Sequence, residues 1–239
     1  MFPIDPAANR RRIYLLRHAE AAYIDDAGRR TTDSRQVPLT TRGRAEAEAM
    51  RQALADIAFD RAVVSGLPRT RETAGIVLTG RVAPAVEVMP AFEEIAPGHF
   101  KDMDPATLFD DFTQGLTRAA TRPESRFLGG ERFDDFAARV VPAFEALAVS
   151  PGWKTLLMVA HGGTNLAALG WAAGIGLQSF AAFEQDSGCM NVIDLDVVEA
   201  RVVRKLVRVV NHTPTSPVKH GLILTTMETM LKAFAAAKD

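Results

Sequence analysis

Two histidines and two arginines stand where their side chains could act together on an anion. Arg17 and His18 adjoin in the segment LLRHAE, directly after a short apolar run. Arg69 follows a second apolar run in VSGLPRTRETA, and His161 follows a third in LLMVAHGG. An arginine presents a fixed fork of N–H donors that matches phosphate oxygens and keeps its charge at physiological pH. The four side chains therefore suit a phosphate group.

A histidine among arginines is also a candidate nucleophile for phosphoryl transfer. Imidazole attacks phosphorus only through an unprotonated nitrogen, and we expect the charge of Arg17 to lower the pKa of His18 and keep it neutral. The transfer depends on positioning and on stabilising charge on the equatorial oxygens, which Arg17, Arg69 and His161 could supply. The leaving alkoxide needs a proton, so a carboxylic acid is expected nearby.

The elements that must position these side chains indicate a parallel sheet covered by helices. Short apolar runs, which predict strands, alternate with longer segments of helical periodicity. The expected strands span 13–16, 62–64 and 155–160, with two more between 190 and 210; the expected helices span 41–58, 68–78, 131–149 (kinked but not ended by Pro142) and a segment after Gly163. The predicted fold class is α/β, a three-layer α/β/α sandwich with a mostly parallel central sheet.

The ends of the predicted strands explain why the basic residues would meet. In open α/β sheets, ligands bind in the crevice beyond the carboxyl ends of the strands, and the basic residues follow three separate strands. Helix N-termini after Pro68 and at Gly162 would add backbone N–H groups and a dipole that favours an anion. We therefore predict one phosphate-binding crevice, with Gly162 among its ligands.

Two segments are less regular than the rest of the chain. Residues 97–128 are polar, contain scattered aromatic residues and are interrupted by prolines, which predicts an insertion over one face. Residues from 213 onward begin with Pro214 and Pro217 and continue as a helix-like run from Leu222 to Ala237. We expect a single domain over residues 1–239, with a cap insertion at 97–128 and a C-terminal helical tail at 213–239.

Composition excludes several classes of protein. The net charge of −1 gives no overall basic field for nucleic acid, and the single Cys189 fits a reducing compartment. Residues 162–183 carry no charge and could span a bilayer, but their glycines, with Gln178 and Ser179, favour a buried helix and a turn. The N-terminal segment is not typical of a secretory signal. We expect a cytoplasmic protein whose partner is a small phosphorylated substrate and which binds neither nucleic acid nor membrane. The sequence does not decide whether the protein forms an oligomer.

The chain resembles the histidine phosphatase superfamily, in the branch that includes cofactor-dependent phosphoglycerate mutase. The resemblance is carried by an ordered set of motifs: LLRHAE, VPLTTRGRAEA, SGLPRTRETA, FEEIAPGHF, GGERFDDFAARV, VAHGG and VRVVNHTP. It implies that His18 is the phosphorylated nucleophile and that Arg17, Arg69 and His161 hold the phosphoryl oxygens. Glu94 aligns with the family's proton donor, and its neighbour Glu93 remains an alternative.

Some positions depart from the family's pattern. Ala19, Ala21 and Ile24 stand where members often have a glycine, a threonine and an asparagine. Ile95, Ala96 and Pro97 follow the acid, where the mutases carry basic and tyrosyl groups that recognise phosphoglycerate. The phosphate pocket would therefore have fewer hydrogen bonds or draw replacements from elsewhere. The departures favour hydrolysis of another monoester over a mutase reaction.

The expected function is thus a metal-independent phosphatase that works through a phosphohistidine and needs no cofactor. Alternatives are a phosphoglycerate mutase-type phosphotransferase and a non-catalytic module that binds a phosphorylated ligand. A metallophosphatase is disfavoured because no HExxH or histidine-x-histidine pair occurs among the five histidines. Basic residues of the insertion could bind a second anionic group or form a solvated face: Lys101, Arg118, Arg122 and Arg126.

Overall fold

One sheet with a parallel centre organises the molecule. The computed structural model describes residues 10–25, 27–31, 33–98 and 105–237. Within these residues the strand order is β3-β2-β4-β1-β5-β6; the first four strands run parallel, β5 is antiparallel to β1, and β6 is antiparallel to β5. The strands are β1 (Arg10–Arg17), β2 (Arg61–Val64), β3 (Val86–Val88), β4 (Thr155–Ala160), β5 (Met190–Val198) and β6 (Arg201–His212).

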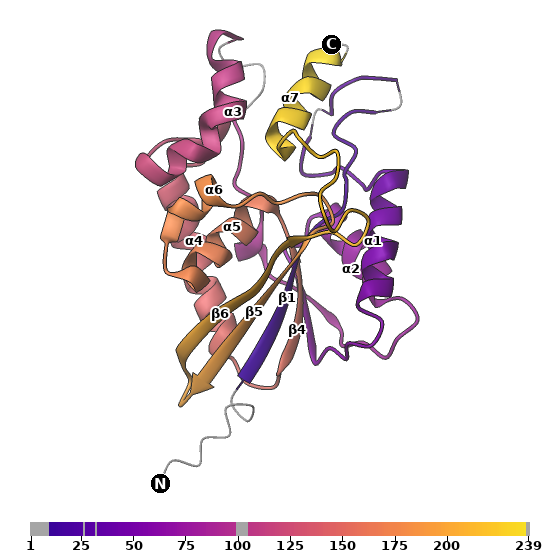
Figure 1. Cartoon of the computed structure of the whole chain (residues 1–239), viewed down its shortest axis with the longest axis vertical. Coiled ribbons are helices and arrows are strands. Elements are labelled where there is room, and N and C mark those ends of the chain that lie inside the picture. Colours follow the sequence, from indigo (N-terminus) through magenta and orange to yellow (C-terminus); the bar gives the residue numbers. More distant parts are fainter. Residues whose placement is uncertain (1–9, 26, 32, 99–104, 238–239) are drawn as a thin grey trace.

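Helices cover both faces of this sheet (Figure 1). They are α1 (Thr41–Ala53), α2 (Pro68–Leu78), α3 (Pro105–Thr121), α4 (Phe133–Val149), α5 (Gly162–Ala173), α6 (Ser179–Ala182) and α7 (Thr226–Ala236), with short 3₁₀ helices η1 (Pro90–Phe92), η3 (Phe127–Gly129) and η4 (Gly176–Gln178). Helices α1 and α2 lie on one face of the sheet, and α4, α5 and α6 lie on the other. Both α3 and α7 stand beyond one end of the sheet.

Alternate residues of β1 supply the two apolar cores. Ile13 and Leu15 pack in the cluster that contains the phenylalanines of α4, whereas Tyr14 and Leu16 pack in the cluster that contains Met50 of α1. Successive side chains of a strand point to opposite faces, so a strand covered on both sides needs an unbroken apolar run. The predicted three-layer α/β/α fold class is confirmed.

Most element predictions hold, with shifts at the ends. α2 and β4 have the predicted bounds, and α4 continues through Pro142 as predicted. α1 ends at Ala53, short of the predicted residue 58, because the N–H of Leu54 caps the last turn. β3 was not predicted, and its three residues are all exposed.

β1 begins earlier than its apolar run predicts. Arg10 to Arg12 belong to the strand: Arg10 and Arg12 pair with acidic residues of the neighbouring β5, and Arg11 donates to the carbonyls of Ala148 and Ser150. Arg10 Nε lies 2.8 Å from Asp196 Oδ1, and Arg12 Nε lies 2.7 Å from Asp194 Oδ1. These three arginines are therefore part of the sheet, with ion pairs at the first and the last of them.

The segment expected to be irregular contains a long helix, α3. Phe112, Leu116 and Ala119 recur at helical spacing and are buried or half-buried. The prolines flank this helix, since Pro105 is its first residue and Pro123 follows its end. His99, Phe100 and Lys101 lie outside the described residues.

The uncharged run 162–183 forms a helix and a turn, as predicted. α5 is buried along nearly its whole length and ends at Gly174, whose φ of 75° suits the left-handed conformation of a helix cap. Within the described parts of the chain, no helix combines the length and apolar character that a membrane crossing requires.

The C-terminal helix packs on the chain's own α3. α7 starts with a capping box in which Thr225 and Glu228 bond each other's backbone N–H groups. Near its end, the ring of Phe234 meets that of Phe112 edge to face, with centroids 6.0 Å apart. The tail therefore folds back over the carboxyl ends of β1 and β4 (Figure 1).

Candidate active site

Three adjacent parallel strands deliver the predicted basic residues to one place. Arg17 at the end of β1 pairs with Ala160 at the end of β4, and the backbone N–H of His18 donates to the Ala160 carbonyl at 3.0 Å. His161 follows β4 directly. β2, on the other side of β4, leads through Ser65 into α2, whose second residue is Arg69. The prediction that the strand ends bring these residues together is confirmed.

His18 is held with one ring nitrogen available. Its side chain is 3% exposed, and Nδ1 lies 2.8 Å from the Ala19 carbonyl oxygen. A carbonyl only accepts, so Nδ1 carries the proton and Nε2 keeps a lone pair. Burial lowers the pKa of His18 well below its ordinary value, and the charges of Arg69 and Arg17 lower it further. The predicted lowering by Arg17 is thus present, but burial is the larger cause.

His161 faces His18 across the site. The two ring centroids are 5.2 Å apart, with an interplanar angle of 64°. Nε2 of His161 lies 2.8 Å from the Ser65 hydroxyl oxygen, which fixes the ring. Burial, followed by the charge of Arg69, lowers the pKa of His161 well below its ordinary value. Its Nδ1 is buried and has no hydrogen-bond partner among the described residues.

Both arginines are buried and anchored at one edge only. Nη1 of Arg69 donates to the Ser34 carbonyl at 3.0 Å, and its guanidinium lies 5.8 Å from the centroid of the Tyr23 ring. Nη1 of Arg17 donates to the Gln185 carbonyl and, at 3.1 Å, to the Thr226 hydroxyl. In each arginine, Nε is buried without a partner in the described part of the chain. A guanidinium anchored in this way has N–H groups left for an anion.

Glu94, and not Glu93, reaches the N-terminus of α5. Oε2 of Glu94 accepts from the Gly163 N–H at 3.2 Å, and Oε1 accepts from the Ile95 N–H at 3.0 Å. Glu93 instead pairs with Arg35 at 2.7 Å. A side chain at position 163 would have its Cβ 2.5 Å from Glu94 Oε1, so this close approach requires glycine. Burial raises the pKa of Glu94, against the opposing effect of the two N–H groups.

A cavity of about 320 Å³ opens beside Arg17, Glu94 and Gly162. His18, Arg69 and His161 are not among its lining residues, so the cavity lies on the side of the carboxyl group. A leaving group that takes a proton from Glu94 would occupy this side. The geometry thus separates a buried, basic compartment from a roomier one, with the Arg17 and Glu94 side chains at the boundary.

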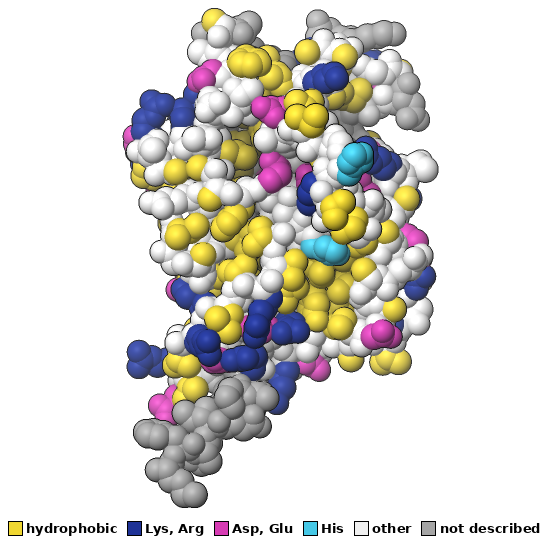
Figure 2. Space-filling model, in the orientation of Figure 1, with side chains coloured by type: hydrophobic (Ala, Val, Ile, Leu, Met, Phe, Trp, Pro, Cys, Tyr) yellow, Lys and Arg dark blue, Asp and Glu magenta, His cyan; other side chains and the backbone are white. Residues whose placement is uncertain are grey.

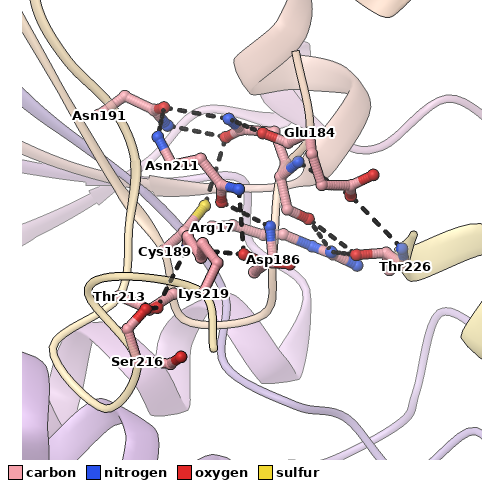
Figure 3. Close-up of polar contacts among 11 residues, drawn as sticks. Arg17, Glu184, Asp186, Cys189, Asn191, Asn211, Thr213, Ser216, Lys219 and Thr226 are labelled. Atoms are coloured by element: carbon pink, nitrogen blue, oxygen red, sulfur yellow. Dashed lines mark hydrogen bonds and ion pairs between the residues drawn. The ribbon is translucent and has the colours of Figure 1, made fainter. Parts of the chain in front are cut away.

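A polar network that the sequence did not predict supports Arg17 from behind (Figure 3). Gln185 and Asn191 exchange two amide hydrogen bonds of 2.7 and 3.0 Å. Asn191 accepts from the Asn211 N–H at 2.9 Å, and Asn211 donates to Asp186 at 3.0 Å. These partners come from the loop before β5, from β5 and from β6, and they are 6 to 25 positions apart in sequence. No clear signal in the sequence indicated this network, because Asn191 is one of three polar residues in β5, with Asp194 and Asp196.

The comparison with protein families agrees with this arrangement. The sequence profile of the histidine phosphatase superfamily (branch 1) matches residues 13–207. The chain belongs to the histidine phosphatase superfamily. Helix α7, and with it Thr226, lies beyond the part of this histidine phosphatase that the profile matches.

Relatives of this histidine phosphatase include phosphatases and mutases. It is 27% identical over 189 residues to the adenosylcobalamin/alpha-ribazole phosphatase of Escherichia coli, covering 77% of this chain and 90% of that protein. It is 30% identical over 168 residues to a 2,3-bisphosphoglycerate-dependent phosphoglycerate mutase of Gloeobacter violaceus, covering 66% and 73%. The crystal structure of the alpha-ribazole phosphatase from Shigella flexneri matches with a TM-score of 0.63 at 25% identity, covering 84% and 96%. These relatives support a phosphatase enzyme.

The three positions at which the loop after His18 departs from the family's sequence pattern carry no polar side chain. Ala19 is buried, and its N–H donates to Thr73 at 3.1 Å. Ala21 and Ile24 form backbone bridges within residues 21–39 and offer no polar side chain. A hydroxyl reaches Arg17 from elsewhere in the chain, because Thr226 of α7 accepts from its Nη1. Among the described residues, no group of three or more histidines, cysteines or acids could hold a metal ion.

Proposed function

We propose that the chain hydrolyses a phosphate monoester through a phosphohistidine at Nε2 of His18. The observation that carries this proposal is a set of three buried nitrogens without partners in the described residues: Nε of Arg17, Nε of Arg69 and Nδ1 of His161. Leaving a buried polar group unsatisfied costs about 1–3 kcal/mol, so two guanidinium donors and an imidazole nitrogen around one histidine favour a ligand rich in acceptor oxygens. A phosphoryl group has three peripheral oxygens to offer them.

In the first step, Nε2 of His18 attacks phosphorus in line. The Nε2–P bond forms as the ester P–O bond breaks, and Glu94 gives its proton to the departing alkoxide. Arg17, Arg69 and His161 stabilise the charge on the three equatorial oxygens. The raised pKa of Glu94 favours the protonated carboxyl that this step uses, and the lowered pKa of His18 favours the neutral imidazole.

In the second step, water attacks the phosphorus of phosphohistidine. Glu94, now a carboxylate, takes a proton from this water as the new O–P bond forms and the Nε2–P bond breaks. Inorganic phosphate leaves, and both His18 and Glu94 return to their starting protonation states. Arg17, Arg69 and His161 stabilise the charge on the phosphoryl oxygens, which is the role that a metal ion would otherwise have. We therefore expect metal-independent turnover without a cofactor.

Phosphate release in the presence of EDTA tests this function. We expect the native protein to release phosphate from a panel of monoesters, and His18→Ala to lose at least 1,000-fold in rate, on the order of removing a catalytic nucleophile. His220→Ala is the matched control, because His220 is exposed. Release that survives unchanged in His18→Ala, or that EDTA abolishes, would contradict the proposal.

A further inference from the structure

The cavity beside Glu94 has mainly apolar walls. Its apolar lining residues come from the loop after Glu94, α3, η3, α5, the region of α6 and α7: Ile95, Phe112, Leu116, Phe127, Leu166, Phe180, Phe183 and Met227. Four threonines also line it: Thr113, Thr117, Thr225 and Thr226. A volume of about 320 Å³ is at the lower end of the range for small-molecule sites.

Charged groups at the cavity disfavour a second anion on the ligand. Within the described residues that line it, Arg17 is the one cation, and the proposed reaction uses it for the phosphoryl group. Glu184 lies in the wall, where its Oε1 accepts from the Thr226 N–H at 3.4 Å. A carboxylate or second phosphate on the ligand would meet this negative charge without a compensating cation.

The described basic residues of the insertion do not supply that cation, because none of Arg118, Arg122 and Arg126 lines the cavity. Arg118 is paired with both Asp110 and Asp111, and Arg126 donates to the Gly130 carbonyl at 2.8 Å. On the face shown in Figure 2, the largest group of lysines and arginines lies over the lower end of β5 and β6, away from α3 and α7. The described part of this region therefore favours an uncharged ligand group.

We propose that this cavity binds the alcohol part of the substrate and that the alcohol is uncharged and apolar, an alkyl chain or an aromatic ring. The inference rests on the proposed function, because it places the ester oxygen next to Glu94, at the cavity's inner end. Residues of α3 and α7 then determine specificity, with Leu116 and Met227 as half-buried, replaceable contacts. Burial of each further methylene would raise kcat/KM about fourfold until the cavity is full.

A matched pair of esters tests this inference. Hexyl phosphate and its analogue with a carboxylate at the far end of the chain have leaving groups of nearly equal reactivity. We expect the native protein to favour hexyl phosphate by at least about tenfold in kcat/KM, since the carboxylate would be buried without a partner. A series of ethyl, butyl and hexyl phosphate should rise steadily.

Met227→Lys places a cation in the cavity wall and should reduce the preference for hexyl phosphate about tenfold. Thr229→Lys is the control, because it adds the same charge to an exposed position of the same helix. This variant should prefer hexyl phosphate over the carboxylate analogue as strongly as the native protein does. Equal or reversed preference in the native protein, a flat chain-length series, or the same shift in both lysine variants would overturn the apolar-alcohol inference. Loss of all His18-dependent release would instead contradict the proposed function itself.

Discussion

The hydroxyl of Thr226 lies 3.1 Å from Nη1 of Arg17, so the first residue of α7 contacts the residue next to His18, the proposed nucleophile. The same hydroxyl donates to the Gln185 carbonyl at 3.0 Å, and that carbonyl also accepts from Arg17. The C-terminal helix is therefore coupled to the guanidinium proposed to bind phosphate.

This contact predicts a positioning role for Thr226. Thr226→Val keeps the shape of the side chain but removes the hydroxyl, and we expect kcat/KM to fall at least about tenfold, the equivalent of one hydrogen bond to a charged group. Thr226→Ser should restore most of the activity. Thr229→Val, on the same helix but exposed, is the control. An unchanged rate in Thr226→Val, or no recovery in Thr226→Ser, would argue against this role.

The two neighbouring glutamates predict opposite outcomes. Glu94→Gln cannot protonate the leaving oxygen, so kcat for an alkyl phosphate should fall about 100-fold or more. Glu93→Gln should keep its activity within about twofold, because Glu93 pairs with Arg35 and lies outside the cavity lining. Steady-state rates of both variants decide this, and a larger loss in Glu93→Gln would reverse the assignment.

The directions of the two pKa shifts predict how kcat/KM depends on pH. Activity needs neutral His18, whose pKa is lowered, so the rate should hold as the pH falls through about 6.5, the ordinary histidine value. Activity also needs protonated Glu94, whose pKa is raised. The decrease of kcat/KM at higher pH should therefore begin above about 4.3, the ordinary glutamate value. Glu94→Gln should lose the fall at higher pH. Retention of that limb in the variant would place the titrating acid elsewhere.

Burial of His18 and His161 as neutral groups predicts acid sensitivity of the fold. Both have a lowered pKa, so the unfolded chain binds more protons at these residues than the folded chain does below about pH 6.5. The free energy of unfolding should therefore fall with decreasing pH, by up to about 1.4 kcal/mol per pH unit for each histidine. Below the folded-state pKa this loss stops.

Urea unfolding at about pH 7.5 and about pH 5.5 measures this effect. Glu94 works in the opposite direction because its pKa is raised, so His161→Gln is needed to isolate one histidine. This variant should show a smaller loss of stability on acidification than the native protein, whereas His220→Gln should match the native protein. Equal acid losses in all three would show that the buried histidines do not cause the sensitivity.

The sequence predicted the parts of the fold that depend on local pattern. The bounds of α2 and β4 follow from Pro68 and from an uninterrupted apolar run, and the meeting of Arg17, His18, Arg69 and His161 follows from the geometry of strand ends. The helix α3 was not predicted, because prolines within residues 97–128 suggest interrupted secondary structure. In the structure Pro105 starts the helix and Pro123 follows its end.

The rest of the site depends on contacts that no local pattern contains. Ser65 orients His161 across 96 positions in sequence, and Thr226 reaches Arg17 across 209. Ser65 begins the motif SGLPRTRETA, but the motif does not reveal its contact with His161, and Thr226 lies outside the quoted motifs. The choice between Glu93 and Glu94 likewise required the position of Gly163, whose N–H meets only one of the two carboxyl groups. Such pairings arise from tertiary packing and appear only in the folded chain.

Trapping the intermediate tests the central claim most directly. The native protein, Glu94→Gln, His18→Ala and His220→Ala would each be mixed with a phosphomonoester, quenched in alkali, where phosphohistidine survives, and mapped by mass spectrometry. We predict a phosphoryl group on His18 in the native protein and in the His220→Ala control. With p-nitrophenyl phosphate, whose leaving group departs without a proton, Glu94→Gln should accumulate more label because its second step lacks a base. No label should appear in His18→Ala. Turnover without any label on His18, or a label on another residue, would contradict the account.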